Sequence, residues 1–304
     1  MSKATVVGVG SLGSCIAYEI ANRGLVDELV LIDVYRELAE GNAADISQAM
    51  AFRSNVQVKA GDYGDAEGSE IIVVTAGKPR TPEMKSRMEL LEVNANIIRA
   101  VGSNLGGIKG EPVIITLTNP VDIMNYIMWR SAGLDRGQVL GSAGMLDSAR
   151  FRAVLSRRYK TPVLDVDAYV IGEHGENQVP VFSRVKIGGE NVFFGRDERT
   201  EIAEELRASA LSVISKKGAT IFAPASNTVN LIQSILLDEK TIGVCSAVLD
   251  GEYNLEGVSI GVPVILGQRG AEGILEWELD EQEKGSFYRG AEHAKGTIEE
   301  MFRR

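Results

Sequence analysis

The sequence predicts an α/β protein with a doubly wound parallel sheet of six strands, followed by a second, α+β region. Two observations predict this fold. In the first half, short and almost continuously apolar runs alternate with stretches of helical spacing, which is typical of parallel strands covered by helices on both faces. Beyond about residue 143, long helical stretches instead flank short strands joined by tight turns. We therefore expect two domains, residues 1–142 and 143–304, with a cleft between them.

The composition is that of a globular protein that binds small molecules. Of 304 residues, 44% are hydrophobic and 24% are charged, which excludes disordered and fibrous classes. The net charge is −10 and Lys and Arg form no dense cluster, so nucleic acid and anionic membranes are not expected partners. No apolar run approaches the roughly 18 residues that a membrane-spanning helix needs. The start of the chain leads directly into a predicted strand rather than a signal peptide, so we expect a cytoplasmic protein.

The two cysteines predict neither a disulfide framework nor a metal site. Cys15 and Cys245 stand alone, without the CxxC spacing of thiolate zinc sites. We expect both to be small buried hydrophobic residues, and we expect no bound metal.

A glycine-rich turn after the first strand is the first functional motif. The apolar run at 4–9 contains Gly8 and is followed by Gly10, Ser11, Leu12 and Gly13, and then by helical spacing that ends near Gly24. The next strand, at 29–32, ends in Asp33, which follows Gly13 by 20 residues. This spacing matches the dinucleotide fingerprint, in which glycines let the backbone approach a pyrophosphate and the acid accepts hydrogen bonds from a ribose. Because the strand, the helix and the acid are all in place, the motif favours a dinucleotide site over an ordinary tight turn. A carboxylate at Asp33 repels the extra phosphate of NADP, so NAD is favoured over NADP.

The remaining elements of the first half complete the predicted sheet. Strands are expected at 56–60, 71–75, 112–117 and 138–142, with helices at 86–104 and 121–131. In a doubly wound sheet, ligands bind where the strand order reverses, at the carboxyl ends of the strands. Functional residues are therefore expected at 75–77 and 118–120.

The second half predicts a mixed arrangement. We expect helices at 147–159, 200–217, 219–237 and 280–302, and strands at 163–171, 181–187, 244–249, 257–264 and 273–277. Short turns between the last three strands indicate antiparallel pairing.

His174, one of two histidines, is the candidate acid/base. It follows an apolar strand and lies between Gly172 and Gly175, which free the backbone to present the side chain. Imidazole suits proton transfer near neutral pH because its unperturbed pKa is about 6.5. A loop histidine can equally be solvated or act as a cap, so this residue does not decide the function alone.

Asp147 and Arg150 are a second candidate pair. Their i, i+3 spacing at the start of a predicted helix places them on one face. One interpretation is a helix N-cap and an exposed ion pair worth only about 0.3–0.5 kcal/mol. In the other, Asp147 orients and stabilises a protonated imidazole while Arg150 binds a carboxylate with its planar guanidinium.

A cationic segment at residues 77–87 follows the fourth strand and contains two prolines. It predicts a lid that closes over the cofactor crevice, expels water and brings Arg80 and Arg87 onto an anionic substrate. The alternative is a solvated basic loop.

Together, these segments resemble the lactate/malate dehydrogenase family along essentially the whole chain. The motifs occur in the family's order: Gly8, Gly10 and Gly13 with Asp33; Thr75-Ala76-Gly77; Asn94; Thr118-Asn119-Pro120; residues 146–150; residues 172–175; and residues 217–220. The resemblance implies a Rossmann-type domain that binds NAD through Gly8, Gly10, Ser11, Leu12, Gly13, Asp33, Thr75, Ala76, Gly77, Asn94, Thr118 and Asn119. It also implies a homodimer or homotetramer.

The resemblance further implies hydride transfer between C4 of the nicotinamide and C2 of the substrate, with His174 as acid/base and Asp147 as its partner. Arg150 would bind the C1 carboxylate and Arg87 would polarise the reacting carbonyl. Asn119 and Thr220 would also contact the substrate.

Arg80 bears on the choice of substrate. Malate enzymes of the family carry an arginine at the lid position that pairs with the second carboxylate, whereas lactate enzymes usually carry glutamine. Arg80 therefore implies oxidation of (S)-malate to oxaloacetate. The usual lid places six steps between this position and the catalytic arginine, and counting back six from Arg87 reaches Thr81. An L-lactate or other 2-hydroxy-acid dehydrogenase thus stays open, and an NAD-binding sensor is the non-enzyme alternative.

Overall fold

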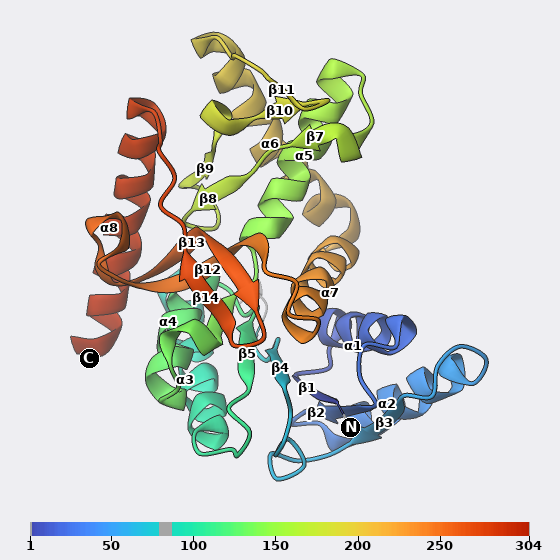
Figure 1. Cartoon of the computed structure of the whole chain (residues 1–304). Coiled ribbons are helices and arrows are strands. Elements are labelled where there is room, and N and C mark those ends of the chain that lie inside the picture. The colour runs from blue at the N-terminus through green and yellow to red at the C-terminus, as the bar shows by residue number, and fades with distance from the viewer. Residues whose placement is uncertain (1, 79–86, 304) are drawn as a thin grey trace.

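One large mixed sheet organises the protein (Figure 1), which we describe from a computed structural model covering residues 2–78 and 87–303. The strand order is β3-β2-β1-β4-β5-β6-β12-β13-β8-β9, with β14 paired to β13. The first six strands are parallel. They are β1 (Lys3–Val7), β2 (Glu28–Ile32), β3 (Gln57–Ala60), β4 (Ile71–Val74), β5 (Val113–Thr116) and β6 (Val139–Gly141). Their order reverses between β1 and β4, which confirms the predicted doubly wound sheet.

The central strands form because their side chains are branched and apolar and are buried on both faces. β4 reads Ile-Ile-Val-Val and β5 reads Val-Ile-Ile-Thr, and every one of these residues is buried. Strands with both faces covered need such continuous apolar runs. β3, at the edge, alternates exposed and half-buried residues instead.

Four helices connect these strands and cover both faces. They are α1 (Ser11–Arg23), α2 (Arg36–Met50), α3 (Arg87–Leu105) and α4 (Val121–Ala132). α1 contacts α2, and α3 packs along α4. α1 ends at Gly24, whose φ of 62° is left-handed, a conformation that glycine adopts readily. The sequence analysis missed α2, although its buried residues Ala39, Ala43 and Ile46 follow helical spacing.

The second half extends the sheet with antiparallel strands. β12 (Thr241–Asp250), β13 (Glu256–Gly267) and β14 (Gly270–Ile274) pair antiparallel, as predicted, and β8 (Val170–Gly172) and β9 (Gln178–Pro180) follow. Four helices surround them: α5 (Gly144–Tyr159), α6 (Arg196–Lys217), α7 (Phe222–Leu236) and α8 (Glu281–Arg303). A small sheet joins β7 (Val166–Asp167), β10 (Lys186–Ile187) and β11 (Glu190–Asn191). Single 3-10 turns lie at η1 (Arg136–Gln138), η2 (Val163–Asp165), η3 (Phe182–Arg184) and η4 (Glu252–Asn254).

Three of the predicted strands were wrong in extent. The strand expected at 163–171 divides into η2, β7 and β8, because Val163 and Leu164 belong to a turn and are exposed at 45% and 91%. The strand expected at 181–187 consists mainly of η3, and only β10 remains of it. The strand expected at 273–277 lies earlier, because β14 ends at Ile274.

The hydrophobic core continues across the expected boundary after residue 142. Its largest cluster contains residues of the parallel strands together with residues of β12, β13, α7 and α8. β6 also pairs with β12, where Gly141 lies opposite Ser246. A smaller cluster, centred on Phe151 and Phe182, lies between α5 and α6 and the small sheet. The two-domain division stays a prediction.

Both cysteines were predicted to be buried, which is confirmed for Cys245 and wrong for Cys15. Both cysteines are free; Cys245 is buried, and burial raises the pKa of its thiol to about 12, whereas Cys15 is only half-buried. Across residues 2–78 and 87–303, no helix is long and apolar enough to span a bilayer.

Gly13→Ala should destabilise the fold, because a Cβ at Gly13 would lie 1.9 Å from the Gly8 carbonyl oxygen and 2.7 Å from Thr75 Oγ1. We expect a loss of about 2 kcal/mol or more in the free energy of unfolding, measured by chemical denaturation. Gly10→Ala is the matched control, since its Cβ would meet no atom within 4 Å. Equal stability of the two variants would contradict this account of helix-to-strand packing.

Candidate active site

The glycine turn, Thr75 and Thr118 meet at the carboxyl ends of β1, β4 and β5. The Thr75 hydroxyl donates to the Gly8 carbonyl oxygen at 2.6 Å. The Thr118 hydroxyl donates to the Ala76 carbonyl oxygen, also at 2.6 Å. These two bonds join three successive strand ends into one rigid edge, at the point where the strand order reverses.

Asp33 is held at the same edge by backbone amides. The Val9 N–H donates to Asp33 Oδ2 at 2.8 Å, and the Tyr35 N–H donates to Oδ1 at 2.9 Å. The carboxylate is therefore fixed beside the glycine turn, where the fingerprint requires an acceptor for ribose hydroxyls.

The first turn of α1 fits a pyrophosphate. Ser11, Leu12 and Gly13 begin the helix, and their N–H groups have no carbonyl acceptor within the helix. Gly10 precedes them and has no side chain to cap them, and the space that its Cβ would occupy is open to 4 Å. A helix N-terminus with close backbone access attracts anions. The residues present thus fit the phosphates and a ribose of a dinucleotide.

Asn94 on α3 connects two of the predicted turns. Its Oδ1 accepts the Lys78 N–H at 2.8 Å, and its Nδ2 donates to the carbonyl oxygens of Lys78 and Asn119, at 3.2 and 2.9 Å. Asn94 is 2% exposed. Its side chain therefore fixes the backbone after Gly77 and at Asn119, whose own side chain is exposed.

His174, Asp147 and Arg150 form one connected array. Asp147 lies in the first turn of α5 and is 3% exposed. Its Oδ2 lies 2.6 Å from His174 Nδ1, and its Oδ1 accepts a hydrogen bond from Arg150 Nη1 at 3.1 Å. The exposed-pair interpretation of Asp147 and Arg150 is wrong, because both side chains are largely buried. Among the described residues, His174 Nε2 has no hydrogen-bond partner.

The electrostatic environment favours the protonated imidazole. Burial of the ring acts to lower the pKa of His174, but the charge of Asp147 and its hydrogen bond outweigh that effect, and Asp122 adds to them. Arg150 opposes the rise. The net result is a pKa above the usual histidine value.

For the remaining predicted substrate-binding residues, the structure shows few contacts or none. Thr220 lies two residues before α7, and its buried Oγ1 has no hydrogen-bond partner among the described residues. Arg87 is the first residue of α3. Arg80 and Thr81 lie outside the described residues, as does most of the expected lid. In the described part of the chain, no group of three or more His, Cys, Asp or Glu residues could hold a metal ion.

Asp122 is a site residue that the sequence analysis missed. Its carboxylate lies in the first turn of α4 and accepts a hydrogen bond from the His174 backbone N–H at 2.8 Å. The available signal was its position two residues after the Thr118-Asn119-Pro120 motif.

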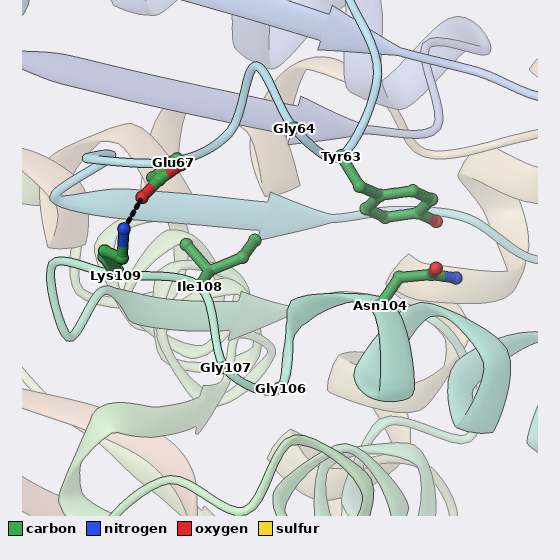
Figure 2. Close-up of a pocket in the computed structure, with 8 residues that line it drawn as sticks. All are labelled: Tyr63, Gly64, Glu67, Asn104, Gly106, Gly107, Ile108 and Lys109. Atoms are coloured by element: carbon green, nitrogen blue, oxygen red, sulfur yellow. Dashed lines mark ion pairs between the residues drawn. The ribbon is translucent and has the colours of Figure 1, made fainter.

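A hollow of about 370 Å³ lies between the segment that joins β3 to β4 and the segment that joins α3 to β5 (Figure 2). Tyr63 and Asn104 lie at one end of it, and the Glu67–Lys109 ion pair, at 3.3 Å, lies at the other. None of the residues that line this hollow is among the predicted site residues, so we do not assign it to the candidate site.

Comparison with known proteins agrees with the geometry. Residues 2–141 match the model of the lactate/malate dehydrogenase NAD-binding domain, and residues 144–304 match that of the family's α/β C-terminal domain. The chain belongs to the lactate/malate dehydrogenase family. It is therefore an NAD-dependent oxidoreductase, and the glycine turn, Asp33 and the α1 N-terminus fit that cofactor.

Individual relatives cover the whole chain. A malate dehydrogenase of Halobacterium salinarum is 43% identical over 99% of this chain and 100% of its own length. L-lactate dehydrogenase 2 of Lactococcus lactis is 36% identical over 98% of both chains. The crystal structure of a minor L-lactate dehydrogenase from Enterococcus mundtii superposes with a TM-score of 0.94 at 31% identity, covering 98% of both chains.

Asp147→Asn should lower the pKa of His174, because the variant keeps the shape of the side chain but removes the charge that stabilises the imidazolium. The measurement is a proton NMR titration of the imidazole resonances, which is simple because the chain has two histidines. The resonance that disappears in His174→Asn belongs to His174. An unchanged midpoint in Asp147→Asn would show that the carboxylate does not set this pKa.

Proposed function

We propose that the protein catalyses the reversible NAD-dependent oxidation of (S)-malate to oxaloacetate. The observation that carries the proposal is the array in which Asp147 contacts both His174 and Arg150. It combines a proton carrier, a charge that stabilises the protonated form, and a guanidinium for a carboxylate. A silent NAD sensor would need none of these groups in contact.

In malate oxidation, His174 takes the proton of the substrate hydroxyl through Nε2, because Nδ1 is occupied by Asp147. NAD, when bound, supplies the hydride acceptor at C4 of its nicotinamide. In the reverse direction, protonated His174 donates to the developing alkoxide at C2. Arg150 binds the C1 carboxylate, and Arg87 polarises the C2 carbonyl as the lid closes.

The choice of malate is supported by Arg80 and by the relatives. Arg80 supplies a second cation for a second carboxylate, and burying it over the methyl group of pyruvate would leave the charge unpaired. The Halobacterium salinarum relative named malate dehydrogenase is more similar to this chain than the Lactococcus lactis lactate dehydrogenase. The alternative is L-lactate oxidation, which stays open because counting back six positions from Arg87 reaches Thr81 rather than Arg80.

Within this proposal, residues 1–142 bind the cofactor and residues 143–304 supply His174 and most substrate contacts. The family models, which meet between residues 141 and 144, support this division. We also propose a cytoplasmic homodimer or homotetramer.

His174→Asn should abolish turnover in both directions and retain NADH binding, because the variant removes the proton carrier and leaves the glycine turn unchanged. Turnover is measured from NADH absorbance, and binding from NADH fluorescence. Turnover at the unsubstituted rate would remove His174 from the mechanism.

Arg80→Gln should lower kcat/KM for oxaloacetate by about 100-fold or more and raise the relative use of pyruvate, because a charged pair with the second carboxylate is lost. Thr81→Gln is the matched variant at the neighbouring position. If Thr81→Gln rather than Arg80→Gln changes the preference, the lid is in the other register. If the unsubstituted protein already prefers pyruvate, it is a lactate-type enzyme.

A further inference from the structure

Asp122 is a buried carboxylate for which the mechanism above has no role. It is 3% exposed and comes from α4, whereas Asp147 comes from α5. Its Oδ2 accepts the backbone N–H of His174 at 2.8 Å, and its Oδ1 accepts the Ser246 hydroxyl at 2.5 Å. His174 is thus held by two acids, one on its ring and one on its backbone.

The position of Asp122 connects the two parts of the site. α4 begins immediately after the turn that contains Thr118 and Asn119, and Asp122 is in its first helical turn. The bond from Asp122 to the His174 N–H spans 52 positions in sequence. One short contact therefore joins His174 to the turn predicted to bind NAD and substrate.

We propose that Asp122 is a positioning residue for the proton transfer: it anchors the backbone of His174 to the nicotinamide side of the site, and its negative charge stabilises the protonated imidazole. The inference rests on the proposed function, in which His174 is the acid/base.

The surrounding charges determine how much this carboxylate contributes. His174 faces Asp147, Asp122 and Arg150, of which Arg150 alone disfavours the imidazolium. The neighbouring Glu173 contacts His293 Nδ1 of α8 at 2.8 Å and also raises the pKa of Asp122. Facing Asp122 itself, the Ser246 hydroxyl and the His174 N–H favour the ionised form.

Burial outweighs these hydrogen bonds and raises the pKa of Asp122 to about 6. The carboxylate is therefore charged at neutral pH and becomes neutral in mild acid, where its support of the imidazolium ends. Above pH 6, both acids act on His174 together.

A purely structural role is the competing explanation, because a buried acid with two hydrogen bonds also holds α4 to its neighbours. Asp122→Asn separates the two explanations. Asparagine retains a carbonyl oxygen that can accept the His174 N–H, but it carries no charge. A structural role predicts unchanged proton affinity of His174, whereas the proposal predicts a lower one.

The experiment is the imidazole NMR titration of the purified full-length protein, with and without NADH. In Asp122→Asn we expect the midpoint of His174 to fall by about one pH unit. The alkaline limb of kcat for oxaloacetate reduction should fall by the same amount, because reduction needs protonated His174. KM for NADH should stay unchanged. An unchanged His174 midpoint would overturn the proposal.

Ser259→Ala is the matched control. Ser259 Oγ contacts Ser246 Oγ at 2.9 Å in the same buried cluster, but its hydrogen bonds do not reach Asp122 or His174. We expect this variant to lose stability while the His174 midpoint stays unchanged. An equal shift in both variants would mean that any damage to the cluster moves the titration, which would also overturn the proposal.

If Asp122→Asn does not fold, Ser246→Ala carries the test. It removes a donor that stabilises ionised Asp122, so the carboxyl becomes neutral at higher pH. The His174 midpoint should then fall by less than one pH unit, and no shift would refute the proposal.

The NMR measurement needs no turnover. A failure of the proposed function therefore shows as no oxaloacetate turnover by the unsubstituted protein, or as an active His174→Asn variant, and a failure of this inference shows as an unmoved His174 midpoint.

Discussion

The parallel pairing of six strands is the constraint on which the site depends. Because the strands run in one direction, all of their carboxyl ends lie along one edge, and because their order reverses between β1 and β4, the connecting helices leave from opposite faces there. The glycine turn, Asp33, Thr75 and Thr118 all lie at that edge. The start of α4 lies there too, and it brings Asp122 within hydrogen-bond distance of a loop from the second half.

The candidate site must bind anions although the protein as a whole is negatively charged. The protein carries a net charge of −10, yet its cofactor and its expected substrate are anions. Under the proposed mechanism, attraction is therefore local: it comes from backbone amides at the α1 N-terminus, the guanidinium of Arg150 and the imidazole of His174. The acids near His174 raise its pKa, although they add to the negative charge of the protein.

The sequence predicted the parallel half of the fold well because two independent signals coincided there. Continuous apolar runs identified buried strands, and the glycine turn with Asp33 fixed their connection. The second half was less predictable, because in short segments such as Val163–Asp165 apolar residues occur in exposed turns, so hydrophobicity alone does not indicate a strand. The buried residues Ala39, Ala43 and Ile46 of α2 follow helical spacing, but alanine is only weakly hydrophobic, so the apolar face of this helix was not apparent in the sequence.

For the site, residue type and order indicated His174, Asp147 and Arg150, but spacing could not show that the three touch, since 27 positions separate Asp147 from His174. The position of Asp122 beside the Thr118-Asn119-Pro120 motif was a signal, but spacing could not show its hydrogen bond to the His174 backbone, 52 positions away. That contact has a mechanical consequence. With a single hydrogen bond between the first turn of α4 and the His174 backbone, there is no intervening loop to absorb a displacement, so a small shift of one half of the site is passed to the other almost undiminished.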